Sequence, residues 1–464
     1  MSEHPPARTP VARRRTVCGL AGPVALALVL VVAVAGGRRA VAEDPAPPLQ
    51  ERVDRAIAQG VAWLRTQQRR DGGFPGLGED RTDSRSYHLM DVGLNALVVL
   101  TLAHGGADAD DDAVKRAMRF CEGHYRGDPR KGSWNLAGDG KLTVYVAATL
   151  ILALDALHDA TGGEPPVVKR DRYGAPQAPR PCRCRYPKRV ERWIRELVDF
   201  LATAQDASGG WRYPGNPIAS EEAATDLSNT QYALLGLAAA ARCGIEVAPE
   251  VWQRAAEHVL REQEADGLEA PWWIVNPAWS EGSEGVERFV VGSQGRSRGW
   301  CYLPGQVALP TGAMTAAGVT CLAVAKERLW HLGALPPALA TRIDLGLRDG
   351  LIWLGENLDV TRNPEPSGAA ALWHYYWLYG LERAGAKAGV RFLGQKDWYA
   401  LGAAYLLGAQ QEDGAWPQAG ADGRPADHTE SPITQTCFAI LFLRRATARP
   451  PIPMTPNVTG GGER

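Results

Sequence analysis

Side chains that can transfer a proton gather at one point of the sequence, where a loop gives way to a long Ala- and Leu-rich run. Asp226 is followed there by Ser228, Asn229, Thr230 and Gln231. Ser228 and Gln231 fit a capping box, and Asp226 can also cap a helix. Because one cap uses only one or two such groups, we take Asp226 as a candidate proton donor and Asn229 and Gln231 as candidate ligand-binding residues. The alternative is that all of them serve the cap and the buried hydrogen bonds around it.

A second candidate segment is aromatic and contains one histidine. It reads Trp373-His374-Tyr375-Tyr376-Trp377. Trp373 and Trp377 share one face of a helix at this spacing, and such a wall can hold an isoprenoid, stabilise a cation or stack on a sugar. His374 is a second candidate acid or base because its ordinary pKa lies near neutrality. The alternative is that these large residues fill a core.

Two further polar residues interrupt apolar segments. Asp91 is a carboxylate in an otherwise apolar run, where burial without a partner is costly, so we take it as a third catalytic candidate. The alternative is that Asp91 caps a first helical turn. Gln435 lies between two threonines at the start of the last apolar segment and is a candidate ligand-binding residue.

The elements that position these residues form a repeat. An amphipathic helix ends in Gln, an acidic-Gly turn follows, and an aromatic residue comes next, most clearly at 56–74, 193–211 and 398–416. Weaker copies lie at 114–134, 251–267 and 347–358. A more apolar helix follows each copy, at about 89–103, 142–158, 228–242, 314–329, 372–384 and 434–445.

Six such pairs predict an all-α fold, an α/α toroid with six inner and six outer helices. The apolar helices need cover on nearly all sides, whereas the amphipathic helices leave one stripe to solvent. We predict one domain over 51–449, with insertions at 162–188 and 269–299 and a disordered tail at 450–464. We expect no strands longer than a few residues.

The Gln, Asp-Gly and aromatic pattern, as in Gln205, Asp206, Gly209, Gly210 and Trp211, resembles the repeats of the squalene–hopene cyclase and protein prenyltransferase β-subunit superfamily. The resemblance covers nearly all of the chain after its first segment. It implies a toroid with a ligand site in a central cavity, at one end of the inner helices, and an isoprenoid-like ligand. Complement-type thioester proteins and cobalamin carriers have related toroids and other functions.

The catalytic motifs of that superfamily are not matched. Asp108-Ala109-Asp110-Asp111 is followed by Asp-Ala rather than Thr-Ala and begins an outer helix, where acidic residues serve as caps. Gln435 stands where the prenyltransferase zinc-binding His is expected, and no Asp-x-Cys pair precedes it. We therefore expect no metal and no cofactor.

Composition excludes one class of partner and the first residues suggest a compartment. Lys and Arg number 51 against 52 Asp and Glu, which gives no bulk attraction to nucleic acid. Arg13 to Arg15, an apolar run and Ala40-Val41-Ala42 predict an export signal over 1–42, followed by a Pro-rich tether at 43–50. We expect a periplasmic or extracellular protein that contacts the membrane only through this segment, with an uncleaved anchor as the alternative.

Four functional hypotheses follow. The first is an exported toroid that binds an apolar or isoprenoid-like small molecule, with the standard chemistry lost or changed. The second is an active terpenoid cyclase with a displaced acid, Asp226 or Asp91. The third is a polysaccharide-binding or polysaccharide-cleaving barrel, which requires Asn229, His374 and Tyr375 to converge. The fourth is a scaffold for a protein partner.

Overall fold

The computed structural model describes residues 47–75, 85–125, 135–136, 140–158, 186–213, 225–275, 288–303, 309–365, 372–416 and 430–445. Side chains at 85–91, 135–136 and 140–141 are outside this description. The chain divides into two compact units, Met1–Ala46 and Pro47–Arg464, and every described residue belongs to the second. The predicted export signal, nearly all of the 162–188 insertion and the 450–464 tail lie outside the described residues.

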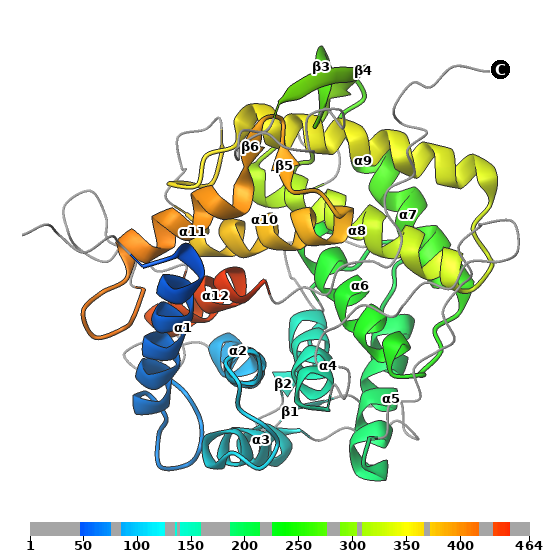
Figure 1. Cartoon of the computed structure of the whole chain (residues 1–464). Helices are drawn as coiled ribbons and strands as arrows, with labels where there is room; N and C mark the ends of the chain where they lie inside the picture. Colours follow the sequence, from blue (N-terminus) through cyan, green and yellow to red (C-terminus); the bar gives the residue numbers. More distant parts are fainter. Residues whose placement is uncertain are drawn as a thin grey trace, which may run out of the picture. The chain divides into compact units, whose positions relative to one another are not determined.

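The described part of the second unit contains twelve helices that alternate between an outer and an inner layer. The outer helices are α1 (Leu49–Thr66), α3 (Asp112–His124), α5 (Lys188–Thr203), α7 (Pro249–Glu262), α9 (Pro337–Asn357) and α11 (Trp398–Ala409). The inner helices are α2 (Arg85–His104), α4 (Val144–His158), α6 (Leu227–Arg242), α8 (Gly312–His331), α10 (His374–Ala388) and α12 (Pro432–Arg444). Each inner helix packs against the next, and α12 packs against α2, so the inner helices form a closed ring (Figure 1). The predicted α/α toroid is confirmed.

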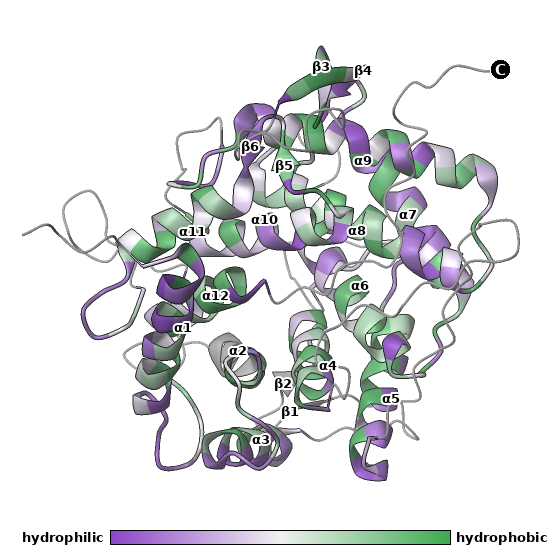
Figure 2. Cartoon of the chain, in the orientation of Figure 1, coloured by the Kyte–Doolittle hydropathy of each residue, from purple (hydrophilic) through white to green (hydrophobic). Residues whose placement is uncertain are grey.

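Burial separates the two layers as the sequence pattern requires. In α6 every residue from Leu227 to Ala241 is buried, because neighbouring helices cover it on all sides. In α5 the buried residues follow one stripe, exemplified by Ile194, Leu197 and Leu201, and the opposite face is polar (Figure 2). Among the described helices, none combines the length and the hydropathy that a membrane span would require.

A glutamine at the end of four outer helices links each helix to the next one. The Nε2 of Gln205 donates to Gly209 O (2.9 Å) in its own turn and to Val251 O (3.0 Å) in α7. Gln410 makes the same pair of bonds, to Gly414 O (3.0 Å) and to Ala56 O (2.9 Å) in α1. Gln68 makes the same pair of bonds, to Gly72 O in its own turn and to Ala113 O in α3. Gln263 also reaches the next outer helix, at Gly346 O in α9, but its second bond goes to the distant Arg298 O. The bond from Gln410 joins the last outer helix to the first and so closes the outer ring.

The aromatic residue after each turn ties an outer helix to the inner helix that follows. Trp211 is fully buried, and its indole Nε1 donates to Leu201 O (2.7 Å) in α5. Its backbone N–H donates to the hydroxyl of Thr230 (3.0 Å) in α6. Trp416 repeats both bonds, with Leu406 O (2.8 Å) and the Thr436 hydroxyl (3.1 Å). Thr230 therefore acts as a structural acceptor in this link.

Glycine is required where each turn touches the next outer helix. Gly209 has φ 101°, and a Cβ there would lie 2.3 Å from Arg254 O. Gly414 has φ 96°, and its Cβ would lie 2.6 Å from Gln59 O. A side chain at either position would combine left-handed backbone strain with a backbone clash.

The expectation of no extended strands is wrong for the insertion at 269–299. Strands β3 (Leu268–Val275) and β4 (Phe289–Ser297) form an antiparallel hairpin there. Buried Asp349 in α9 anchors it by accepting from Arg298 Nε (2.9 Å) and from the backbone N–H of Arg296 (3.2 Å). Most of β3 is half-buried on both faces, so no polar–apolar alternation marks it in the sequence. Short two-residue strands also pair, β1 (Asn135–Leu136) with β2 (Gly140–Lys141) and β5 (Phe392–Leu393) with β6 (Lys396–Asp397).

The ring-closing bonds give a stability prediction. Gln410→Ala removes the donor to two backbone carbonyls, and we expect it to lower the free energy of unfolding by about 1–3 kcal/mol. The matched control is Gln411→Ala, because among the described residues that exposed side chain bonds only to Ala409 O in its own turn, at 3.3 Å. Urea unfolding of both variants measures the difference. Equal stability of the two variants would contradict the linking role of Gln410.

Candidate functional site

The first turns of three inner helices meet through hydroxyl groups. Tyr145 in α4 hydrogen bonds to the hydroxyl of Ser228 in α6, which also bonds to the hydroxyl of Tyr376 in α10 (2.7 Å). The Tyr376 hydroxyl lies 3.4 Å from Gln231 Oε1 as well. These three helices therefore present polar groups to one another at the amino-terminal end of the inner ring. We refer to Tyr145, Ser228 and Tyr376 as the hydroxyl chain.

Asp226 lies beside the hydroxyl chain and caps α6. Its Oδ1 accepts from the backbone N–H of Asn229 (2.7 Å), and its Oδ2 accepts from the Asn229 side-chain amide (2.7 Å). The capping alternative is thus confirmed for one oxygen, and Asn229 holds the second. The side chain is 3% exposed, and burial raises the pKa of Asp226 to about 6, although the two bonds oppose that rise.

Four tyrosines surround this carboxyl group closely enough for its charge to raise their pKa values, in addition to the larger effect of burial. They are Tyr145, Tyr213, Tyr302 and Tyr376. Tyr145 stacks on Tyr213 with ring centroids 5.6 Å apart, and Tyr213 is only half-buried. Tyr302 is 41% exposed, so this side of the site borders solvent.

Two amide groups of the site have an atom with no hydrogen-bond partner among the described residues. They are the Oδ1 of Asn229 and the Nε2 of Gln231, and both side chains are buried. Buried polar atoms in native proteins are normally satisfied, so these two are available to a ligand or to water. Asn229 and Gln231 were both predicted to bind a ligand.

Trp373 borders the same end of the ring in a strained conformation. It is the N-cap residue of α10 with φ 58° and ψ 35°, a left-handed geometry that is uncommon for a bulky side chain. Its ring is 48% exposed and meets Tyr376 edge-on, with centroids 6.4 Å apart. Strain of this kind is often found at ligand sites, and the binding role of Trp373 stays a prediction.

Three other residues of the aromatic segment point away from Asp226. His374 Nε2 pairs with Val360 O (3.0 Å), and burial lowers its pKa. Trp377 is fully buried and donates to Asp359 O (2.9 Å). Tyr375 is also buried, and its ring packs on that of His374. The convergence of Asn229, His374 and Tyr375 that a polysaccharide site required is not formed, because the last two lie on another face of α10.

The remaining predicted residues are less informative. Gln435 is buried in the first turn of α12. Asp91 lies in α2, but its side chain is outside the described part of the chain. The Asp108–Asp111 run has the capping role that was expected, because Asp111 Oδ1 accepts from the backbone N–H groups of Ala113 (2.9 Å) and Val114 (3.2 Å).

One carboxylate was missed by sequence reasoning. Glu430 accepts from the backbone N–H groups of Tyr375 (3.2 Å) and Tyr376 (2.8 Å), so it caps α10 from a distant segment. Burial raises the pKa of Glu430 to about 7. No local signal marks this role, since capping patterns are read from neighbours in sequence and Trp373 supplies no cap itself.

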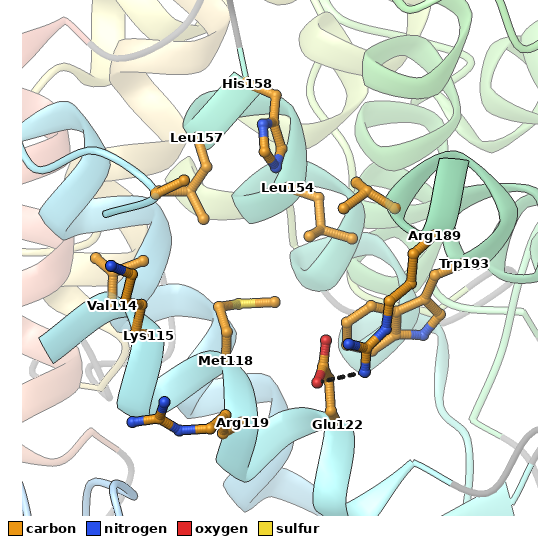
Figure 3. Close-up of a pocket in the computed structure, with 12 residues that line it drawn as sticks. Val114, Lys115, Met118, Arg119, Glu122, Leu154, Leu157, His158, Arg189 and Trp193 are labelled. Carbon is orange, nitrogen blue, oxygen red and sulfur yellow. Dashed lines mark hydrogen bonds and ion pairs between the residues drawn. The ribbon is translucent and has the colours of Figure 1, made fainter. Parts of the chain in front are cut away.

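A separate cavity of about 360 Å³ lies between α3, α4 and α5 (Figure 3). Met118, Leu154 and Trp193 are among its apolar lining, and Arg189 pairs with Glu122 at 2.7 Å on its rim. It involves the last turns of α4 rather than the first, so it is distinct from the hydroxyl chain and Asp226. Within the described residues, no three His, Cys, Asp or Glu side chains come together as metal ligands would.

Comparison with known proteins supports the fold but assigns no function. No protein-family model and no curated protein sequence matches the chain. Among solved structures, cellobiose 2-epimerase from Bacillus thermoamylovorans is similar with a TM-score of 0.50 and 11% identity, over 85% of this chain and 99% of that one. The type II terpene cyclase MstE from Scytonema (TM-score 0.47, 13% identity) aligns over 86% of this chain and 98% of its own. The GH76A alpha-1,6-mannanase from Salegentibacter (0.47, 9%) aligns over 86% and 99%.

Cellobiose 2-epimerase therefore shares the α/α toroid fold that the helix packing of this chain defines. At such low identity the likeness carries no activity from any of these three proteins to this chain.

The raised pKa of Asp226 gives a pH prediction. Between pH 4 and 6 the unfolded carboxyl ionises while the folded one stays protonated, so its contribution to stability falls as the pH rises. A rise from 3.8 to about 6 corresponds to on the order of 3 kcal/mol. Asp226→Ser keeps a cap of the kind that Ser431 gives α12 and removes this titration. Urea unfolding should show the free energy of unfolding of the wild type falling relative to that of the variant between pH 4 and 6. A difference between the two proteins that does not change with pH would contradict the raised pKa.

Proposed function

We propose that this protein is an acid–base enzyme that binds a hydroxylated small molecule at the amino-terminal end of its inner ring. The observation that carries the proposal is Asp226, a buried carboxyl group with a pKa raised to about 6 among tyrosine hydroxyls. Such a group is still partly protonated near neutral pH and can both give and take a proton. Asp226 is assigned the transfer of a proton to or from an oxygen of the ligand.

The polar character of the surroundings favours an oxygen-rich ligand such as a sugar. The hydroxyl chain can donate and accept hydrogen bonds, and the unpartnered atoms of Asn229 and Gln231 add one acceptor and one donor. A carboxyl group with a pKa near 6 is also a weak acid. It is better suited to protonating an oxygen lone pair than a carbon–carbon double bond.

An isoprenoid-like ligand is the second candidate, as in the squalene–hopene cyclase and prenyltransferase superfamily that the repeats resemble. It is favoured by the aromatic surface that α10 and α12 build together. Tyr379 stacks on Phe438 with centroids 5.5 Å apart, and Tyr376 meets the same ring edge-on at 6.0 Å. In this alternative Asp226 is the displaced acid of a terpenoid cyclase, and the rings stabilise positive charge on the ligand.

We further propose that the chain is exported through its first 42 residues and works outside the cytoplasm, with a small molecule rather than a nucleic acid as its partner. The Arg13–Arg15, apolar and Ala-Val-Ala pattern supports export. N-terminal sequencing of protein recovered from an exporting host is expected to begin at Glu43. An intact Met1 in the membrane fraction would instead support the uncleaved anchor.

The catalytic proposal is tested by offering the purified protein two panels, oligosaccharides with and without uronic acid residues, and polyprenyl alcohols. Native mass spectrometry measures binding, and chromatography with mass detection measures conversion. We expect a sugar to bind and be converted, with the rate of acid catalysis falling as the pH rises through about 6. Asp226→Asn is expected to reduce the rate by about 100-fold or more.

The matched control is Asp397→Ser, which changes a similar cap on outer helix α11, where Asp397 accepts from Ala400 N–H at 2.9 Å. Its activity should equal that of the wild type. If a polyprenyl alcohol binds and no sugar does, the isoprenoid candidate is favoured over the sugar. If neither panel binds, both candidates are wrong.

A further inference from the structure

Arg383 is a buried cation inside the inner ring. It lies on α10 and is 1% exposed. None of its three guanidinium nitrogens has a hydrogen bond of ordinary geometry within the described part of the chain. Buried arginines in native proteins are normally paired with a carboxylate or fully hydrogen bonded, because removing the charge from water is expensive.

Tyrosine rings surround this guanidinium. Its Cζ lies 4.2 Å from the ring centroid of Tyr379, 5.1 Å from that of Tyr232 and 5.7 Å from that of Tyr376. Cation–π contacts and the nearby Tyr232 hydroxyl offset part of the desolvation cost but supply no negative charge. Glu382 directly precedes Arg383 in α10, and the side chains of successive helical residues point about 100° apart. Its charge acts on Tyr399 of outer helix α11 as well as on Tyr379.

Tyr376 contacts both Arg383 and a second group with an unpartnered donor, the side-chain amide of Gln231. Gln231 in α6 uses its Oε1 to approach the Tyr376 hydroxyl, which leaves its Nε2 without a partner among the described residues. Tyr376 is the ring that also lies against Arg383. A guanidinium, an amide N–H and tyrosine hydroxyls are all donors, so together they suit an acceptor that carries negative charge.

We propose that Arg383 and Gln231 form a subsite for a carboxylate of the bound ligand. The planar fork of a guanidinium matches the two oxygens of a carboxylate. The guanidinium Cζ lies 5.7 Å from the ring centroid of Tyr376, and Gln231 Oε1 lies 3.4 Å from the Tyr376 hydroxyl. The acid group of the ligand therefore lies beside the hydroxyl chain. This inference rests on the proposed function, because it names the class of substrate as a carboxylic acid.

Matched pairs of probes test the subsite. Glucuronate is compared with glucose, and hexanoate with hexanol, by isothermal titration calorimetry on the whole mature chain. We expect the acid of at least one pair to bind about tenfold more tightly than its neutral partner or better. Arg383→Met should abolish this preference. Arg328→Met is the matched control, since Arg328 in the last turns of α8 also has an unpartnered Nε, and it should keep the preference.

The preference for the acid probe over the neutral one does not depend on the proton transfer assigned to Asp226. Asp226→Ser should retain it, because that substitution leaves Arg383 and Gln231 in place. If Arg383→Met does not fold, Gln231→Leu replaces it and should weaken binding of the acid by about fivefold. Equal binding of acid and neutral probe in both pairs would overturn the subsite, as would a preference that survives Arg383→Met. Inorganic phosphate binding tighter than either acid would also overturn the assignment to a carboxylate. A preserved preference in a protein without acid–base activity would overturn only the proposed function.

Discussion

The structure depends on one recurring interaction, a glutamine side-chain amide that spans from its own turn to the backbone of the next outer helix. Gln205 makes this link between α5 and α7, and Gln410 makes it between α11 and α1. The amide satisfies carbonyl groups that the buried helix junction would otherwise leave unpaired. One such bond joins the last repeat to the first, so the outer ring of helices is closed. The first turns of the inner helices α4, α6 and α10 lie together at one end of this ring.

Several buried polar groups lie at that end of the ring. The hydroxyl chain joins the first turns of α4, α6 and α10, and Asp226 lies beside it with its carboxyl group buried. The repeat thus explains both the fold and the site, since the turn that carries the glutamine and the aromatic residue also delivers each inner helix to the same place. Arg383 lies farther along α10, with its Cζ 4.2 Å from the ring centroid of Tyr379.

The sequence was sufficient to predict the repeat and both helix layers, because apolar periodicity and turn chemistry are local properties. It also singled out Asp226, Asn229 and Gln231 from an excess of polar groups at one helix start. It could not show that His374 faces Val360 rather than Asp226, because helical periodicity does not reveal which face of α10 meets which neighbour. Arg383 and Glu430 were missed for a related reason, since their importance arises from partners on other helices or from the lack of them. The β3–β4 hairpin has no alternation that a pattern search could detect.

The central claim is that burial raises the pKa of Asp226, so that its carboxyl group is still partly protonated near neutral pH beside the hydroxyl chain. The direct measurement is the pH titration of its side-chain carboxyl carbon by NMR, with the signal assigned by its loss in Asp226→Ser. The account predicts a midpoint near pH 6, because burial outweighs the two hydrogen bonds from Asn229. A midpoint below the ordinary value of 3.8 would show an ionised helix cap and would contradict the assignment of Asp226 as the proton donor.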